Sequence, residues 1–338
     1  MSHQNKLLPL SLNEKQARLR LIRTETIGPI TFHTLLKKYE SAEKALEVLP
    51  HLAKRGGRLK PLIIPDLETV LKEWQALEAF GGSFLFYGDH DYPVLLSYLE
   101  DAPPVLAVKG RVDLLHQPCL AMVGARNASV NGRLLARTFA GDLGTKHFTI
   151  VSGLARGIDT AAHEGALKTG TIAVVAGGIN IIYPPENKIL FDHIASEGLI
   201  VAETPFGVAP LASSFPRRNR LISGLCQGLI IIEAALKSGS LITATYAAEQ
   251  GRDVFAIPGF PLDPRCQGSN KLIQEGAHLV QNTEDIIKNL NTFKPIPLTQ
   301  IECAQECNQD ISDTALEEGR EKIKENLNFS PLHIDELI

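Results

Sequence analysis

Residues 122–168 read MVGARNASVNGRLLARTFAGDLGTKHFTIVSGLARGIDTAAHEGALK, and this stretch decides the fold class. An apolar strand ends at Val123, and a helix is expected from about Val130 to Leu143. A second strand is expected at 148–151, and a second helix opens near Ile158. Short β-branched runs that alternate with segments of helical length are typical of parallel βαβ units.

Both of these strands are followed by glycine and arginine. The first is followed by Gly124 and Arg126, and the second by Ser152, Gly153, Arg156 and Gly157. In parallel sheets ligands bind beyond the carboxyl ends of the strands, where glycine turns let backbone N–H groups face an anion at a helix N-terminus. The sequence therefore predicts one phosphate-facing edge built from two neighbouring strand ends.

The same alternation continues along the chain. Further apolar strands are expected at 84–87, 105–108, 172–176, 199–202, 229–232 and 254–257, with helices at 186–197, 220–225, 241–250, 269–275 and 283–290. These strands lack period-two alternation, as expected for strands that are covered on both faces. The prediction is an α/β domain over residues 81–292 with one mostly parallel sheet.

The composition is that of an ordinary globular protein, with 44% hydrophobic and 21% charged residues among 338. The net charge of -4 argues against wholesale coating of nucleic acid, although a local basic patch remains compatible with it. The five cysteines are scattered and odd in number, which indicates reduced thiols, and Cys303-x3-Cys307 lacks a second ligand pair for zinc. No signal peptide is recognisable, and the apolar run 229–236 is too short to cross a bilayer, so a cytoplasmic location is expected.

Residues 1–80 are expected to form a small helical domain. Helices are predicted at 12–24, 32–39 and 66–80, and the break Ile27-Gly-Pro-Ile30 joins the first two. This layout fits a helix-hairpin-helix, whose turn amides can contact a DNA phosphate. We favour the simpler interpretation, an ordinary helical hairpin with glycine and proline at the caps, because short turns match easily.

The densest basic cluster is Phe215-Pro-Arg-Arg-Asn-Arg220. Proline ahead of the arginines fits a helix N-terminus, where guanidinium groups and free amides can share a phosphate. The aromatic ring of Phe215 is suited to stacking on a base. The alternative is a solvated charged face, which is the usual fate of a charge run.

A second anion site is suggested by Lys237-Ser-Gly-Ser240, which lies between an expected strand and an expected helix. The loop resembles a nest of backbone amides with a cation beside it. The alternative is an ordinary serine cap with an incidental lysine.

Several enzyme motifs are excluded by inspection. The loop after Gly124 does not complete G-x-G-x-x-G, and no G-x-x-x-x-G-K-[ST] occurs. Asp159 and His163 stand four residues apart on one helix, but without a third ligand we interpret them as a helix-capping acid and a packed histidine. No nucleophilic triad is legible, so no catalytic residue, metal site or cofactor is predicted.

Five motifs in order resemble the DNA-processing protein A family (DprA, also called Smf), over about residues 12–290. They are Val123-Gly-Ala-Arg126, Ser152-Gly-Leu-Ala-Arg-Gly-Ile-Asp-Thr-Ala-Ala-His163, Phe215-Pro-Arg-Arg-Asn-Arg-Leu-Ile-Ser-Gly224, Lys237-Ser-Gly-Ser-Leu-Ile-Thr243 and Gly251-Arg-Asp-Val-Phe-Ala-Ile-Pro-Gly259. The resemblance implies an extended Rossmann-like domain that forms a homodimer and needs no cofactor. It also implies a bacterial cytoplasmic protein that binds and protects single-stranded DNA and loads a RecA-type recombinase on it, as in natural transformation.

The resemblance and the strand-end argument together place DNA binding at Gly124, Arg126, Ser152, Gly153, Arg156, Gly157, Phe215, Arg217, Arg218, Asn219, Arg220, Lys237, Ser238, Gly239 and Ser240. In this interpretation Arg126, Arg218, Arg220 and Lys237 contact phosphates, and Phe215 stacks on a base.

The chain departs from the family pattern at two places. Some relatives carry a lysine where this chain has Ala212, and Arg217 is the candidate to compensate for it. Many relatives end in a winged-helix-like domain, whereas residues 293–338 are expected to be a charged linker and only the start of such a domain.

The rival interpretation is a Rossmann-like nucleotide phosphoribohydrolase. Those enzymes also place a glycine-rich loop, an arginine and a glutamate at strand ends, and Glu233 with Ser238-Gly-Ser240 could imitate that arrangement. Their Pro-Gly-Gly-x-Gly-Thr loop is missing from this sequence.

Overall fold

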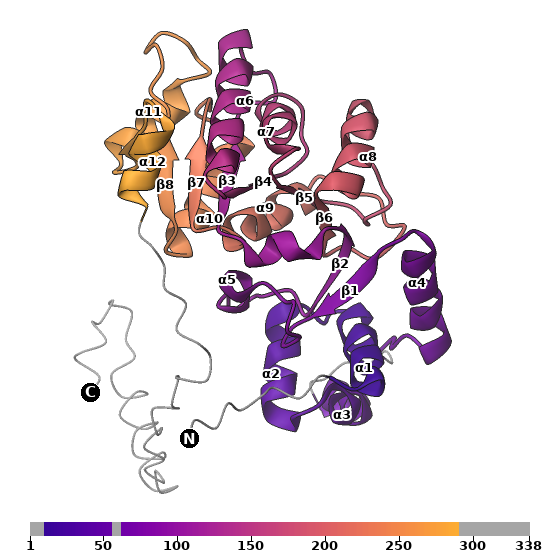
Figure 1. Cartoon of the computed structure of the whole chain (residues 1–338). Coiled ribbons are helices and arrows are strands. Elements are labelled where there is room, and N and C mark those ends of the chain that lie inside the picture. Colours follow the sequence, from indigo (N-terminus) through magenta and orange to yellow (C-terminus); the bar gives the residue numbers. More distant parts are fainter. Residues whose placement is uncertain (1–9, 56–61, 291–338) are drawn as a thin grey trace, which may run out of the picture. The chain divides into compact units, whose positions relative to one another are not determined.

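In the computed structural model, residues 10–55 and 62–290 are described, and all of them belong to one compact unit. They contain a nine-stranded sheet in the order β1-β2-β6-β5-β4-β3-β7-β8-β9 (Figure 1). Its strands are β1 (Ser83–Phe86), β2 (Val105–Gly110), β3 (Cys119–Val123), β4 (Thr149–Ser152), β5 (Thr171–Val175), β6 (Leu199–Ala202), β7 (Gly228–Ile231), β8 (Asp253–Ala256) and β9 (His278–Leu279).

The sheet is mostly parallel, as the sequence predicts. From β6 across the sheet to β9 all neighbours pair in parallel, and only β1 with β2 and β2 with β6 are antiparallel. From β3 the chain adds β4, β5 and β6 on one side, and it then returns to place β7 on the other side of β3. This reversal between β3 and β7 is the topological switch point at which open α/β sheets form their ligand crevice.

The alternate residues of each central strand enter two different cores. Leu120 and Met122 of β3 pack in one hydrophobic cluster, and Ala121 and Val123 pack in another. Both faces are therefore buried, which is why the strand lacks period-two alternation.

Helices cover both faces of the sheet (Figure 1). The cluster on one face includes side chains of α6 (Val130–Thr145) and α7 (Ile158–Ala166), and that on the other includes α9 (Ser214–Gly224) and α10 (Gly239–Glu249). The remaining elements of this part are α5 (Val94–Ser97), η1 (Val112–His116), η2 (Pro185–Asn187), α8 (Lys188–Glu197), α11 (Gln267–Gln274) and α12 (Thr283–Asn289).

The amino-terminal part contains four helices, α1 (Leu12–Arg23), α2 (Pro29–Tyr39), α3 (Ala42–Arg55) and α4 (Leu67–Ala79). Leu19 of α1 and Leu77 of α4 join Phe84 and Phe86 of β1 in one buried cluster. Helices α1 and α4 therefore share a hydrophobic core with the edge of the sheet. The predicted limits of the domains stay a prediction, and the predicted linker and tail at 293–338 lie outside the described residues.

Several elements differ from expectation. The sequence predicts no helix at α3, which contains Pro50, and no strand at β9, which has only two residues. Helix α9 begins at Ser214 and not near Arg220, so the whole Phe215–Arg220 cluster lies on its first two turns. Because the helix begins at Ser214, Arg218 and Arg220 lie on its buried side.

Candidate nucleic-acid interface

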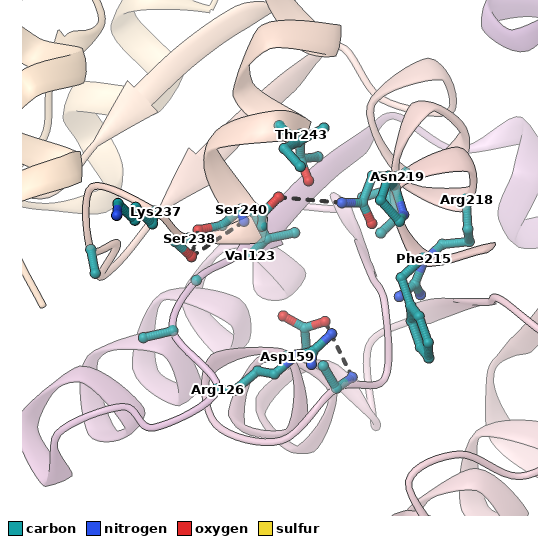
Figure 2. Close-up of a pocket in the computed structure, with 18 of the residues that line it drawn as sticks. Val123, Arg126, Asp159, Phe215, Arg218, Asn219, Lys237, Ser238, Ser240 and Thr243 are labelled. Carbon is teal, nitrogen blue, oxygen red and sulfur yellow. Dashed lines mark hydrogen bonds between the residues drawn. The ribbon is translucent and has the colours of Figure 1, made fainter. Parts of the chain in front are cut away.

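A cleft of about 750 Å³ opens at the switch point between β3 and β7 (Figure 2). Its walls come from the loop after β3, the loop after β7, the start of α9 and the start of α10. The lining includes Gly124, Ala125, Arg126, Asn127, Tyr183, Phe215, Asn219, Lys237, Ser238, Gly239, Ser240 and Thr243. The predicted edge built from strand ends is therefore present as a concave surface.

Two glycines lock the loops after β3 and β4 together. A Cβ atom at Gly124 would lie 2.7 Å from Ile158 Cγ1, and one at Gly157 would lie 2.3 Å from the Ala125 carbonyl oxygen. Gly157 also has φ +80°, which disfavours side chains. This close approach holds the adjacent Arg126 at the rim of the cleft.

Arg126 and Lys237 are the exposed cations of the predicted set that line this cleft. The Arg126 guanidinium lies 5.5 Å from the centroid of the Phe215 ring, within cation–π range. Neither Arg126 nor Lys237 forms an ion pair with any residue that the structure describes. Both charges are thus available to an anionic ligand.

The start of α10 adds backbone donors to the cleft. Ser238 is its N-cap, and the Ser238 Oγ accepts a hydrogen bond from the Ser240 amide at 3.3 Å. Asn219 Nδ2 donates to the Gly239 carbonyl at 3.3 Å, which ties α9 to this loop. A helix start beside Lys237 is an arrangement that favours anions.

Arg218 lines the cleft but is almost fully buried. Only 7% of it is exposed, and its Nη1 donates to the carbonyl oxygens of Gly153 (2.6 Å) and Val174. Burial lowers the pKa of Arg218 to about 10, so the group stays charged at neutral pH. The Arg218 guanidinium also leaves no room for a side chain at position 153, because a Cβ atom there would lie 2.5 Å from Arg218 Nη1.

Arg220 is also buried, with 5% exposed. Its guanidinium pairs with Glu203 at 2.6 Å and with Asp101 Oδ2 at 3.2 Å. The Arg220 guanidinium is thus held by the protein itself, whereas Arg218 Nε has no hydrogen-bond partner among the residues that the structure describes. The phosphate contacts expected of both arginines stay a prediction.

The other predicted residues also include both exposed and buried side chains. Arg217 is exposed, lies 3.5 Å from Glu203 and lines a separate cavity of about 290 Å³, and its role as a replacement for a cation at Ala212 stays a prediction. Arg156 is exposed and lies 3.6 Å from Glu186, outside the cleft. Ser152 is buried, and its hydroxyl donates to the Met122 carbonyl at 2.7 Å.

Asp159 and His163 are structural, as the sequence suggests. The Asp159 carboxylate accepts hydrogen bonds from the amides of Gly153 (3.1 Å) and Ala155 (3.2 Å); burial raises its pKa, and nearby Arg218 opposes that shift. His163 Nδ1 lies 2.7 Å from Thr171 Oγ1. Burial, helped by the charge of Arg218, lowers the pKa of His163 to about 3.

Glu233 does not line the cleft. Its carboxylate accepts from the Ser129 amide at 2.9 Å and from the Ser129 hydroxyl at 2.5 Å, at the start of α6. A Cβ atom at Gly132 would lie 2.6 Å from Glu233 Cδ, so the carboxylate fills a space that glycine leaves. Glu233 thus caps a helix, and this removes the acid that the phosphoribohydrolase interpretation needs.

Two features were not predicted from the sequence. Tyr183, in the loop after β5, lines the cleft and contacts Phe215, and Arg265 lines it while paired with Asp263 at 2.7 Å. Neither residue belongs to a glycine-rich or basic run that could have indicated it.

One group among residues 10–55 and 62–290 could hold a metal ion. It consists of the exposed His90, Asp91 and His116, whose ligand atoms lie within 4.8 Å of one another and outside the cleft. Within the same residues, no helix combines the length and apolarity that crossing a membrane requires.

Comparison with known proteins assigns the family. A family model described as DNA recombination-mediator protein A matches residues 83–291, and one described as a DprA-like N-terminal HHH domain matches residues 13–76. The DNA processing protein DprA of Streptococcus pneumoniae is 47% identical over 268 residues, which cover 76% of this chain and 93% of that protein. Protein Smf of Escherichia coli is 46% identical over 202 residues, covering 59% of this chain and 54% of that protein.

Two solved structures agree with this assignment. The X-ray structure of the Streptococcus pneumoniae protein matches with a TM-score of 0.70 and 34% identity, covering 84% of this chain and 99% of that chain. DNA processing protein A from Helicobacter pylori, described for its single-stranded DNA binding mode, matches with a TM-score of 0.57 and 33% identity, covering 62% and 95%. This chain belongs to the DNA recombination-mediator protein A family, also called DprA or Smf.

Proposed function

We propose that this protein binds single-stranded DNA in the cleft between β3 and β7 and loads a RecA-type recombinase on it. The observation that carries the proposal is the convergence of Arg126, Phe215 and Lys237 on one concave surface (Figure 2). The similar protein from Helicobacter pylori has a single-stranded DNA binding mode, which supports the same ligand here.

The chemistry of the cleft suits a single strand and no particular sequence. Exposed guanidinium and ammonium groups bind phosphates, and an aromatic face stacks on any base. Contacts of these two kinds carry no information about the identity of the base. Duplex DNA hides its base faces, so we expect it to bind more weakly than a single strand.

Protection of incoming DNA, recombinase loading and a homodimer are the finer parts of the proposal, and they rest on membership of the family. A cytoplasmic location belongs to the same proposal. The protein is expected to act by binding alone, without a cofactor and without turnover of nucleotides.

The test is fluorescence anisotropy with a labelled oligo-dT strand, using Arg126→Ala/Lys237→Ala as the cleft variant and Arg111→Ala as the control. Arg111 is an exposed arginine outside the cleft and outside the predicted set, so its loss should change affinity little. The cleft variant should lose most of its affinity and should fail to promote recombinase filaments on strands coated with single-strand-binding protein. Equal affinities of the wild type and the cleft variant would refute the proposal.

A nucleotide-hydrolysis assay on the same samples addresses the rival activity. We expect no release of base or phosphate from nucleoside monophosphates or ATP. Steady hydrolysis that disappears in Glu233→Gln would favour the phosphoribohydrolase instead.

A further inference from the structure

Tyr183 is a cleft residue that the proposed DNA contacts leave unused. It lies between β5 and η2, is 46% exposed, and lines the same cleft as Arg126 and Lys237. Its ring centroid lies 5.2 Å from that of Phe215, with an angle of 54° between the ring planes. Arg126 contacts the same Phe215 ring, so a cation and two aromatic rings form one continuous surface.

The loop that carries Tyr183 is held in place by its neighbours. The amide of Ile181 donates to the Gly178 carbonyl at 2.8 Å, and the amide of Gly178 donates to the Val208 carbonyl at 2.8 Å. The amide of Gly207 donates to Asn180 Oδ1 at 2.7 Å. A half-exposed aromatic on such a braced loop is preorganised for a ligand, because little side-chain or loop ordering remains to oppose binding.

The spacing of the two rings decides how bases can use them. A base inserted between two aromatic rings requires the rings to lie about 7 Å apart, twice the roughly 3.5 Å contact distance. At 5.2 Å the gap between Tyr183 and Phe215 is too small, so the pair is a platform and not a slot. Because the planes are tilted by 54°, bases stacked on the two rings cannot remain parallel to each other.

We propose that Tyr183 is a second base-stacking residue of the cleft. One base of the strand stacks on Phe215, a nearby base stacks on Tyr183, and the strand bends between them. The ligand class is an unpaired nucleobase of any identity. This inference rests on the proposed function, since it adds a contact to the same site.

The matched variants are Tyr183→Ala and Tyr183→Phe, measured by anisotropy with oligo-dT at several salt concentrations. Tyr183→Ala should weaken binding by about 5- to 150-fold, the range expected for one base–aromatic stack. The salt slope should stay unchanged, because no phosphate contact is lost. Tyr183→Phe should bind like the wild type, and an abasic strand should bind equally to all three proteins.

A second measurement needs no variant. Strands carrying 5-iodouracil should photocrosslink to the wild-type protein at Tyr183 as well as at Phe215, located by mass spectrometry of the peptides. The inference is overturned if Tyr183→Ala keeps wild-type affinity, or if no crosslink maps to Tyr183, while Arg126→Ala/Lys237→Ala loses binding. If that double variant also keeps its affinity, the whole cleft proposal fails, and the two failures are thereby distinguished.

Discussion

The cations around this cleft fall into two groups that the sequence does not separate. Arg126 and Lys237 are exposed in the cleft, whereas Arg218 and Arg220 are buried, with Arg218 lining the cleft and Arg220 outside it. The buried pair belongs to the densest basic run of the chain, and the exposed pair does not. Arginines in one sequence cluster can therefore form hydrogen bonds and ion pairs within the protein as well as contacts with a ligand.

The buried arginines connect α9 to four other parts of the molecule. Arg218 bonds to the loop after β4 and to β5, and Arg220 bonds to Glu203 and Asp101. Phe215 lies one helical turn before Arg218 on the same helix. We infer that Arg218 and Arg220 hold α9 in place and thereby position Phe215. Their influence on DNA binding is therefore indirect.

Arg220→Ala should produce the largest effect on stability. Removing Arg220 takes the closer cation from the largely buried Glu203 carboxylate, which keeps only the longer contact with Arg217. Breaking a buried pair in this way costs about 3–5 kcal/mol in the free energy of unfolding. Urea denaturation of wild type and variant measures this difference. If Arg220→Ala unfolds like the wild type but loses affinity for single strands, Arg220 is a DNA contact and the distinction between the two groups is broken.

Gly153→Ala tests the placement of Arg218. The new methyl group would meet Arg218 Nη1 at 2.5 Å, and this guanidinium cannot swing away without losing its bonds to Gly153 and Val174. Such overpacking costs about 1–3 kcal/mol. In a double-mutant cycle with Arg218→Met, the penalty of Gly153→Ala should shrink, because the group that it meets has gone. Additive penalties would show that the two residues do not touch.

His163 makes the stability of the folded protein sensitive to acid. Its folded pKa of about 3 lies below the usual value of 6.5, so between these pH values the unfolded chain binds a proton that the folded protein does not. Stability therefore falls as the pH falls, by about 1.4 kcal/mol for each pH unit below 6.5. His163→Asn keeps a donor for Thr171 and removes the titration.

The measurement is the free energy of unfolding at about pH 7.5 and about pH 5.5. The wild type should lose about 1.4 kcal/mol more than His163→Asn between these two values. Shifts from the other titrating groups, including the lowered pKa of His33 and the raised pKa of Asp159, occur in both proteins and cancel in this difference. Equal losses would place a solvated histidine at position 163.

Much of the fold was readable because it rests on local patterns. Apolar runs and helical spacing indicate eight of the nine described strands, and glycine after β3 and β4 indicates the edge where the cleft opens. The burial of Arg218 was not readable, because it depends on Gly153, Val174 and Asp159, which approach only in the folded sheet. Tyr183 was missed for the same reason, since its contact with Phe215 joins segments about thirty residues apart.

Lys237→Ala should have the smallest effect on stability and a clear effect on binding. The ammonium group is exposed and has no ion pair among the residues that the structure describes, so its loss should change the free energy of unfolding by less than about 0.5 kcal/mol. If Lys237 contacts a phosphate, removing it should flatten the log–log salt dependence of affinity for a single strand by roughly 0.7.

Lys237→Arg is the matched control, since it keeps the charge and should keep the slope. Arg218→Ala provides the contrast from the buried group. It should lower stability strongly, and at temperatures where it remains folded its salt slope should match that of the wild type, because a guanidinium bonded to two carbonyls releases no counterion from DNA. The opposite pattern, a flattened slope for Arg218→Ala and an unchanged one for Lys237→Ala, would exchange the roles of the two groups. Stability and salt slope measured together can thus assign each cation to the scaffold or to the ligand, which affinity alone cannot do.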